Sequence, residues 1–224
     1  WKFTNNLSSA MIIAGMTVVL IIVAHPWGTR IAIIGGIASV PAVSIIRSVA
    51  VQLAQSSDSF RWGRIQAWLN PESESSGKGY QIMQGLYALG SGGLFGKGLG
   101  NSAQKLGAVP EAQNDMIFTI VCEELGVFGA AVLTMLFVFL LYRLFFIAQN
   151  APDLLGSLIV TGIFAQVALQ VILNIAVVLN VIPATGITLP FISYGGTSIV
   201  FLMAEMGIAL SVADKIRLKD EYTL

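Results

Sequence analysis

The chain alternates long apolar runs with polar stretches. The run Leu7–Ala24 carries no charged residue and, at about 1.5 Å per helical residue, is about 27 Å long, close to the thickness of a bilayer's hydrocarbon core. A second run contains glycine and Pro41, which membrane helices tolerate when neighbouring helices satisfy the backbone. The pattern predicts five membrane-spanning helices: Leu7–Ala24, Ile31–Ile46, Met116–Ile147, Leu154–Ile182 and Ile199–Ala213.

Two polar segments interrupt these runs. The first, Ser48–Asp115, is rich in Gly and Ser and too polar to span a membrane, and loops of such length are usually functional or disordered. Its Trp and Tyr residues favour the headgroup level, so we expect a folded loop that lies partly at the membrane interface. The second, Pro183–Gly196, is punctuated by Pro and Gly and can re-enter the membrane to line a cavity.

Composition strengthens the membrane prediction. Hydrophobic residues make up 55% of the chain and charged residues 11%, whereas an ordinary soluble domain carries about 25% charge. The formal net charge is zero, which argues against nucleic-acid binding. One cysteine and one histidine, Cys122 and His25, exclude an intrachain disulfide framework and a Cys/His metal cluster. The sequence therefore predicts an all-α polytopic membrane helix bundle, with residues 1–224 forming a single membrane domain.

The distribution of basic residues predicts the orientation. The chain starts at Trp1 just ahead of an apolar run, so we expect a fragment of a longer protein. The short loops and the C-terminal tail on one side hold Arg30, Arg143, Lys215, Arg217 and Lys219. By the positive-inside rule that side is cytoplasmic, which places Ser48–Asp115 and Pro183–Gly196 outside. The basic residues of the long loop count little, because the rule concerns short loops.

Glycine recurs throughout Gly77–Gly126, where it is mixed with polar and basic side chains. Glycine permits positive φ and close backbone approach to a ligand, and exposed N–H groups with point charges suit an anionic headgroup. The alternative is a flexible surface loop with solvated lysines. The spacing matches neither the P-loop nor the dinucleotide fingerprint.

Asp115 stands where the polar segment meets a membrane helix. An acid partly screened from water at that boundary can act as a general base. The alternative is a helix N-cap, a role that Asn114 can fill equally well. Glu111 offers a second carboxylate four residues earlier.

Three more acids lie within the predicted membrane helices. Glu123 and Glu124 come two turns into one helix, where a charge usually faces a cavity or a partner. Glu205 is enclosed by apolar sequence in the last helix. It either makes a structural pair or hydrogen bond within the bundle, or lines a cavity for a lipid headgroup.

Two long motifs resemble a known family. They are NPESESSGKGYQIMQGLYALGSGGLFGKGLGNSAQKLGAVPEAQNDMIF, from Asn70, and PATGITLPFISYGGTS, from Pro183. Both resemble the SEDS proteins, whose members include FtsW, RodA and SpoVE. The resemblance runs from about Arg61 to Gly207, with the helices between the motifs in the right order, and GLGNSAQKL is more similar to the FtsW/SpoVE branch. The family fold has about ten membrane helices, so the resemblance implies that this chain is roughly its C-terminal half.

The resemblance implies a peptidoglycan glycosyltransferase that polymerises lipid II into a growing glycan strand during cell division or sporulation. It implies a bacterial cytoplasmic membrane location with the active site outside, and a class B penicillin-binding protein and other divisome proteins as partners. An α-linked donor that gives a β-linked product implies inversion by single displacement. Asp115 matches the family's essential acid and would remove the proton from the attacking 4-hydroxyl.

The departing pyrophosphate needs stabilisation, which basic side chains or a bound divalent cation, Mg²⁺ or Mn²⁺, can supply. No resident metal site is predicted. The expected substrate contacts are Arg61, Arg64, Lys97, Ser102, Gln104, Lys105, Glu111, Thr188, Ser193, Tyr194 and Gly195.

The chain departs from the family pattern around the acid. Where the family has Pro-Glu-x-His-Thr-Asp-Phe, this chain reads Pro110-Glu111-Ala112-Gln113-Asn114-Asp115-Met116. Asp115 is retained, and the changed neighbours put efficient activity in question. Two alternatives therefore stay open: a flippase or other transporter of lipid-linked precursors, since transporters also have broken helices and intramembrane acids, and a non-catalytic scaffold of the division complex. A cavity that opens only outside and contains Asp115 favours the enzyme.

Overall fold

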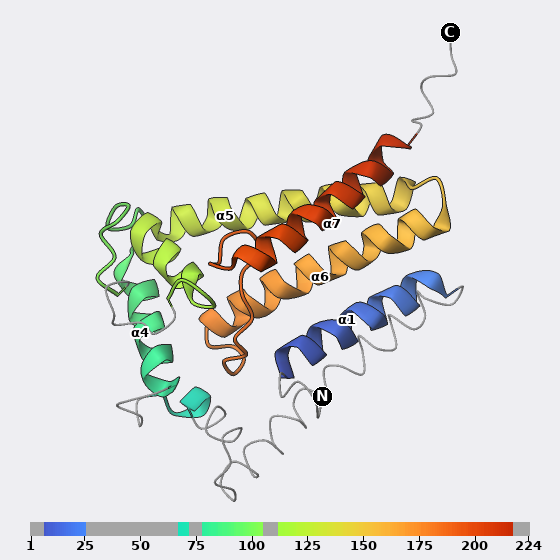
Figure 1. Ribbon diagram of the computed structural model, residues 1–224. Coiled ribbons are helices and arrows are strands. Elements are labelled where there is room, and N and C mark those ends of the chain that lie inside the picture. The colour runs from blue at the N-terminus through green and yellow to red at the C-terminus, as the bar shows by residue number, and fades with distance from the viewer. Residues whose placement is uncertain (1–6, 26–66, 72–77, 105–111, 217–224) are drawn as a thin grey trace, which may run out of the picture.

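The computed structural model describes residues 7–25, 67–71, 78–104 and 112–216, and in these ranges the protein is helical without strands (Figure 1). The helices are α1 (Leu7–Ala24), α4 (Lys78–Ser91), α5 (Ile117–Asn150), α6 (Leu154–Val178) and α7 (Gly196–Asp214). The predicted all-α class is confirmed. Three of the helices, α5, α6 and α7, are long and apolar enough to cross a membrane, and α1 provides a shorter apolar helix. The predicted span Ile31–Ile46 lies outside the described residues.

Helix α6 lies at the centre of the bundle, where it packs against α1, α4, α5 and α7. Figure 1 shows α1, α5, α6 and α7 side by side, with α4 crossing the end at which α5 begins. Phe137, Val167 and Leu202 are among the buried residues of the core between α5, α6 and α7. Large apolar side chains such as Met135 and Phe139 point outward from α5, as expected where a helix faces lipid.

The helix ends differ from the predicted bounds. Helix α6 ends at Val178 instead of Ile182, because Asn180 adopts a left-handed conformation with φ 56° and the chain turns before Pro183. Helix α7 begins at Gly196, ahead of the predicted Ile199. Helix α5 begins one residue after the predicted start and extends to Asn150. Hydropathy marks the apolar part of a helix, whereas backbone hydrogen bonds decide where the helix stops.

Helix α5 is interrupted at Gly126, whose φ of 68° and ψ of −169° are not helical. In a regular helix the carbonyls of Glu123 and Glu124 would accept from the N–H groups of Val127 and Phe128. Here those carbonyls accept instead from two N–H groups of the segment Gly92–Gly100, which we call the glycine loop. The donors are Lys97 N and Gly98 N, both at 2.9 Å.

The exchange of hydrogen bonds is reciprocal. Val127 N–H donates to the carbonyl of Gly93 at 3.0 Å, and Phe128 N–H donates to the carbonyl of Leu94 at 3.1 Å. The glycine loop therefore replaces the backbone bonds that the kink at Gly126 removes, and the kinked helix keeps its peptide groups paired.

Two glycines of the loop are required by this contact. A side chain at Gly92 would collide with the carbonyl of Cys122, and one at Gly96 would collide with the carbonyl of Glu124. Gly96 also has a φ of 76°, which disfavours other residues. These glycines permit two backbones to approach each other. The N–H groups of Lys97 and Gly98 are used in this contact, and a ligand-binding role for the rest of the segment stays a prediction.

Candidate functional site

Asp115 lies in a turn just before α5 and is half-buried. Its backbone carbonyl accepts a 2.8 Å hydrogen bond from the side-chain amide of Asn174, near the end of α6. The same Asn174 amide donates to the carbonyl of Ile187 at 2.7 Å. One buried side chain therefore joins the turn that carries Asp115 to the segment Pro183–Gly196, which we call the second loop.

The second loop makes further bonds to the same turn. Ser193 Oγ donates to the carbonyl of Asn114 at 2.6 Å and accepts from the N–H of Leu189 at 2.7 Å. Tyr194 N–H donates to the carbonyl of Gln113 at 2.8 Å. The predicted approach of the second loop to the end of Ser48–Asp115 is confirmed by these contacts.

The carboxylate of Asp115 faces Gly186 of the second loop. A Cβ atom placed at Gly186 would lie 4.0 Å from Asp115 Oδ2. The φ of 73° at Gly186 favours glycine at this contact. The arrangement presents an acid at the junction of a helix and a loop, where a general base can meet a substrate hydroxyl.

The alternative role of Asp115 as a helix cap is wrong. The N-cap of α5 is Met116, whose side chain makes no capping hydrogen bond. Asn114 does not occupy the N-cap position either. Helix α6 shows the contrast, because its N-cap Asp153 accepts from Gly156 N–H at 3.2 Å. Asp115 therefore precedes the N-cap position, and its backbone carbonyl is bonded to Asn174.

Glu123 is completely buried and accepts hydrogen bonds from Lys97 of the glycine loop and from residues on either side of that loop. Lys97 Nζ lies 2.6 Å from Glu123 Oε1, and Ser102 Oγ donates to Oε2 at 2.5 Å. Ser91 Oγ donates to Oε1 at 3.2 Å, and Gln104 N–H donates to Oε2 at 3.4 Å. The prediction that an acid at this depth has a partner is confirmed for Glu123. Lys97 and Ser102 thus have a partner inside the protein, and their contact with substrate stays a prediction.

Lys97→Met is expected to lower the apparent Tm of the whole protein by about 5 °C, because it leaves the buried Glu123 charge unpaired. Breaking a fully buried pair costs ~3–5 kcal/mol, and we expect about 2 kcal/mol here because Lys97 is 37% exposed and water screens the pair. Thermal unfolding in detergent measures the change. Adding Glu123→Gln removes the unpaired charge and should restore most of the loss. An unchanged Tm in Lys97→Met would contradict a stabilising pair.

Glu205 in α7 bonds to a neighbouring helix. Gln166 Nε2 of α6 donates to its two carboxylate oxygens at 2.9 and 3.2 Å. The interpretation of Glu205 as the acceptor of a hydrogen bond within the bundle is confirmed. The contact joins α6 to α7.

The remaining predicted residues are dispersed. In the second loop Ser193 is buried and hydrogen-bonded, Thr188 is half-buried, Tyr194 is 77% exposed, and Gly195 is the N-cap of α7. Gln104 joins the Glu123 cluster through its backbone. Four predicted residues lie outside the described part of the chain: Arg61, Arg64, Lys105 and Glu111. Among the described residues, no three His, Cys, Asp or Glu side chains group closely enough to hold a metal ion.

Sequence reasoning missed Asn174 and Gly126. Asn174 is 1% exposed and supplies both bonds that fasten the turn before α5 to the second loop. Asn174 could have been found in the sequence as a side-chain amide within an otherwise apolar helix. Such a group needs hydrogen-bond partners inside the bundle. Gly126 lies two residues after Glu124 and precedes a long uncharged run, which placed it near the membrane boundary.

Comparison with known proteins indicates one family. The family of cell cycle proteins comprising FtsW, RodA and SpoVE matches residues 2–218. The chain is 43% identical over 211 residues to stage V sporulation protein E of Bacillus subtilis, an alignment that covers 93% of this chain and 54% of that protein. It is 37% identical over 213 residues to a probable peptidoglycan glycosyltransferase FtsW of Trichlorobacter lovleyi, covering 95% and 54%.

A solved structure shares the fold. Its description reads "Structural coordination of polymerization and crosslinking by a peptidoglycan synthase complex", and it matches with a TM-score of 0.69 and 25% identity. The match covers 99% of this chain and 58% of the other. The chain spans about half the length of the curated relatives it matches.

Proposed function

Because the chain belongs to the FtsW/RodA/SpoVE family of cell cycle proteins, we propose that the whole protein is a peptidoglycan glycosyltransferase that polymerises lipid II. The observation that carries the proposal is the placement of Asp115. Its backbone carbonyl is bonded to Asn174, and its carboxylate lies beside Gly186 of the second loop. That arrangement suits a base that meets a substrate hydroxyl. It does not suit a structural cap.

In the proposed reaction, Asp115 accepts the proton of the 4-hydroxyl of the incoming lipid II as the oxygen attacks the anomeric carbon of the growing strand. The bond from that carbon to the lipid pyrophosphate breaks in the same displacement. The configuration inverts, and no covalent enzyme intermediate forms. The second loop restricts the position of the turn that carries the base, so the carboxylate needs little reorganisation before the proton transfer.

The pyrophosphate leaves with additional negative charge, which requires cationic partners. We assign this role to Arg61, Arg64 and Lys105, with Glu111 as a second carboxylate near the base. A divalent cation, Mg²⁺ or Mn²⁺, would enter bound to the pyrophosphate, as Mg²⁺ does with substrate phosphates. The other proposed substrate contacts are Thr188, Tyr194 and Gly195.

The chain is a membrane protein, and we propose that Asp115 faces the outside of the cytoplasmic membrane. Arg143 and Lys215 lie toward the end of the bundle opposite Asp115 and mark the cytoplasmic side by the positive-inside rule. The partner would be a class B penicillin-binding protein that crosslinks the new strands. The structural relative described as a peptidoglycan synthase complex supports an assembly of this kind.

The proposal is tested by mixing the purified whole protein and its partner with lipid II and separating the products on a gel. Polymerised glycan is expected even when a β-lactam blocks the partner's crosslinking, because polymerisation uses a different site. A reaction without this protein is the control. If the wild-type complex makes no polymer but moves lipid II across vesicle membranes, the protein is a transporter. If it does neither, a scaffold role replaces the enzyme.

A further inference from the structure

The glycine loop presents three large apolar side chains on its outer surface. Leu94, Phe95 and Leu99 are 69%, 83% and 76% exposed. Lys97 is the one charged residue of Gly92–Gly100, and its ammonium group turns inward to Glu123. The loop therefore places its charge against the protein and its apolar side chains toward its surroundings, the reverse of what water favours.

The depth of the loop follows from its bonds to α5. The uncharged helical stretch Val127–Tyr142, which follows the kink at Gly126 and precedes Arg143, rises about 24 Å at 1.5 Å per residue, somewhat less than the ~30 Å of a hydrocarbon core. The core must therefore cover nearly all of this stretch. Val127 and Phe128 lie at its Glu124 end and donate to Gly93 and Leu94. The loop consequently lies level with the outermost part of the hydrocarbon on the Asp115 side.

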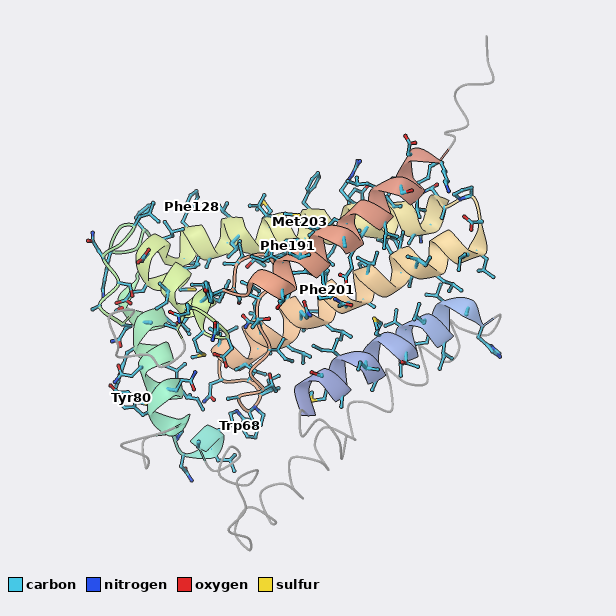
Figure 2. All side chains as sticks on the ribbon, in the orientation of Figure 1. Trp68, Tyr80, Phe128, Phe191, Phe201 and Met203 are labelled. Atoms are coloured by element: carbon cyan, nitrogen blue, oxygen red, sulfur yellow. The ribbon has the colours of Figure 1, made fainter. Side chains whose placement is uncertain are left out.

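The apolar surface of the loop continues onto α5. Val127 and Phe128 are 60% and 66% exposed, and Figure 2 shows Phe128 on the side of α5 away from α6, close to the glycine loop. Residues of α5 that follow, such as Met135, extend the same apolar surface toward the other end of the bundle. The same lipid tails can therefore cover both the glycine loop and α5.

Much of the loop's backbone is hydrogen-bonded within the protein, as contact with lipid requires. Irregular backbone is tolerated at membrane depth only when its polar groups are satisfied within the protein. Gly93 O, Leu94 O, Lys97 N and Gly98 N are all bonded to α5, and Gly96 N–H donates to Gly92 O at 2.8 Å. Asn101 Nδ2 donates to the carbonyl of Lys97.

We propose that the glycine loop is a membrane anchor that inserts Leu94, Phe95 and Leu99 among the acyl chains of the leaflet on the Asp115 side. The proposal rests on the depth of α5 and not on the glycosyltransferase reaction. The anchor holds α4 and the start of α5 at a fixed level, so the turn that carries Asp115 keeps a constant height above the lipid.

The test uses the whole protein with every native cysteine, including Cys122, replaced by alanine. A single cysteine at position 95 (Phe95→Cys) is labelled with the environment-sensitive fluorophore NBD, and the protein is reconstituted in phosphatidylcholine–phosphatidylglycerol vesicles. Met135→Cys serves as the deep-lipid control and Gln113→Cys as the aqueous control, since both positions are exposed. Quenching is measured with lipids carrying a nitroxide at a shallow or a deep acyl position, and with iodide in the water.

The label at position 95 should lose emission about twofold with the shallow nitroxide and less with the deep one, while iodide has little effect, as for an interfacial anchor. The label at Met135→Cys should respond more to the deep nitroxide, and that at Gln113→Cys to iodide. If position 95 follows the Gln113→Cys pattern, the loop lies in water and the proposal fails. If neither quencher reaches it, another protein surface covers the loop and the proposal also fails.

Discussion

Asp115→Asn is expected to reduce glycan polymerisation by the whole protein with its partner by ~100-fold or more, because asparagine cannot accept the proton of the attacking hydroxyl at neutral pH. Folding should be unaffected. The bond from Asn174 goes to the main-chain carbonyl of residue 115, and α5 takes no cap from this side chain. The measurement is the initial rate of polymer formation from lipid II, with lipid II binding and thermal stability determined on the same preparation.

Asp153→Asn is the matched control at the other end of the bundle. Asp153 caps α6, and asparagine is a comparably good N-cap, so this variant should retain both stability and polymerisation. Near-normal polymer from Asp115→Asn would exclude Asp115 as the base. Loss of polymer in both variants would indicate a general effect of removing a carboxylate.

The sequence predicted the positions of the membrane helices, because each of them is a long run of apolar residues. The runs that became α1, α5, α6 and α7 are long and nearly free of charge, so hydropathy located them within a few residues. Their ends were less predictable. Asn180 and Gly126 adopt positive φ, and such a choice depends on which distant segment offers replacement hydrogen bonds.

The candidate site was predicted in part. The position of Asp115 at a loop–helix boundary was visible in the sequence, and the motif Pro183–Gly196 was expected to approach it. The roles of Lys97 and the nearby glycines could not be read from the same evidence. A Gly-rich segment with a lysine has the same composition whether it binds an anion or packs against a kinked helix, and only the contact with Glu123 distinguishes the two.

The roles of four acids, Asp115, Glu123, Asp153 and Glu205, show another limit of prediction from sequence. Sequence placed Glu123 and Glu205 within membrane helices, where a charge requires a partner. It could not say which partner. Glu123 pairs with Lys97 from a loop, whereas Glu205 accepts from Gln166 across the bundle. The carboxylate of Asp115 lies beside Gly186 of the second loop, and Asp153 serves as a cap. Similar side chains thus have structural or chemical roles according to what the tertiary fold brings beside them.

Asn174→Ala is expected to lower both stability and turnover, because Asn174 is the donor for the part-buried carbonyl of Asp115 and the buried carbonyl of Ile187. Each carbonyl left without a donor costs ~1–3 kcal/mol, so the apparent Tm should fall by several degrees. The side-chain Oδ1 of Asn174 has no partner among the described residues, which leaves the amide N–H groups as its contribution. Asn174→Asp keeps the shape and removes these donors, so it should be at least as damaging.

A positioning role for Asn174 predicts a specific kinetic result. Without the hydrogen bonds of Asn174 the turn that carries Asp115 can shift. A displacement of about 1 Å can lower the rate up to ~100-fold. We expect kcat to fall ~10-fold or more in Asn174→Ala, with a much smaller change in KM for lipid II, because the substrate contacts are elsewhere. Asn150→Ala is the matched control: its amide also donates to a carbonyl, that of Phe146, but at an exposed site on α5. It should leave kcat and Tm nearly unchanged. If Asn174→Ala loses stability while the folded fraction turns over normally, Asn174 supports the fold and does not position the base.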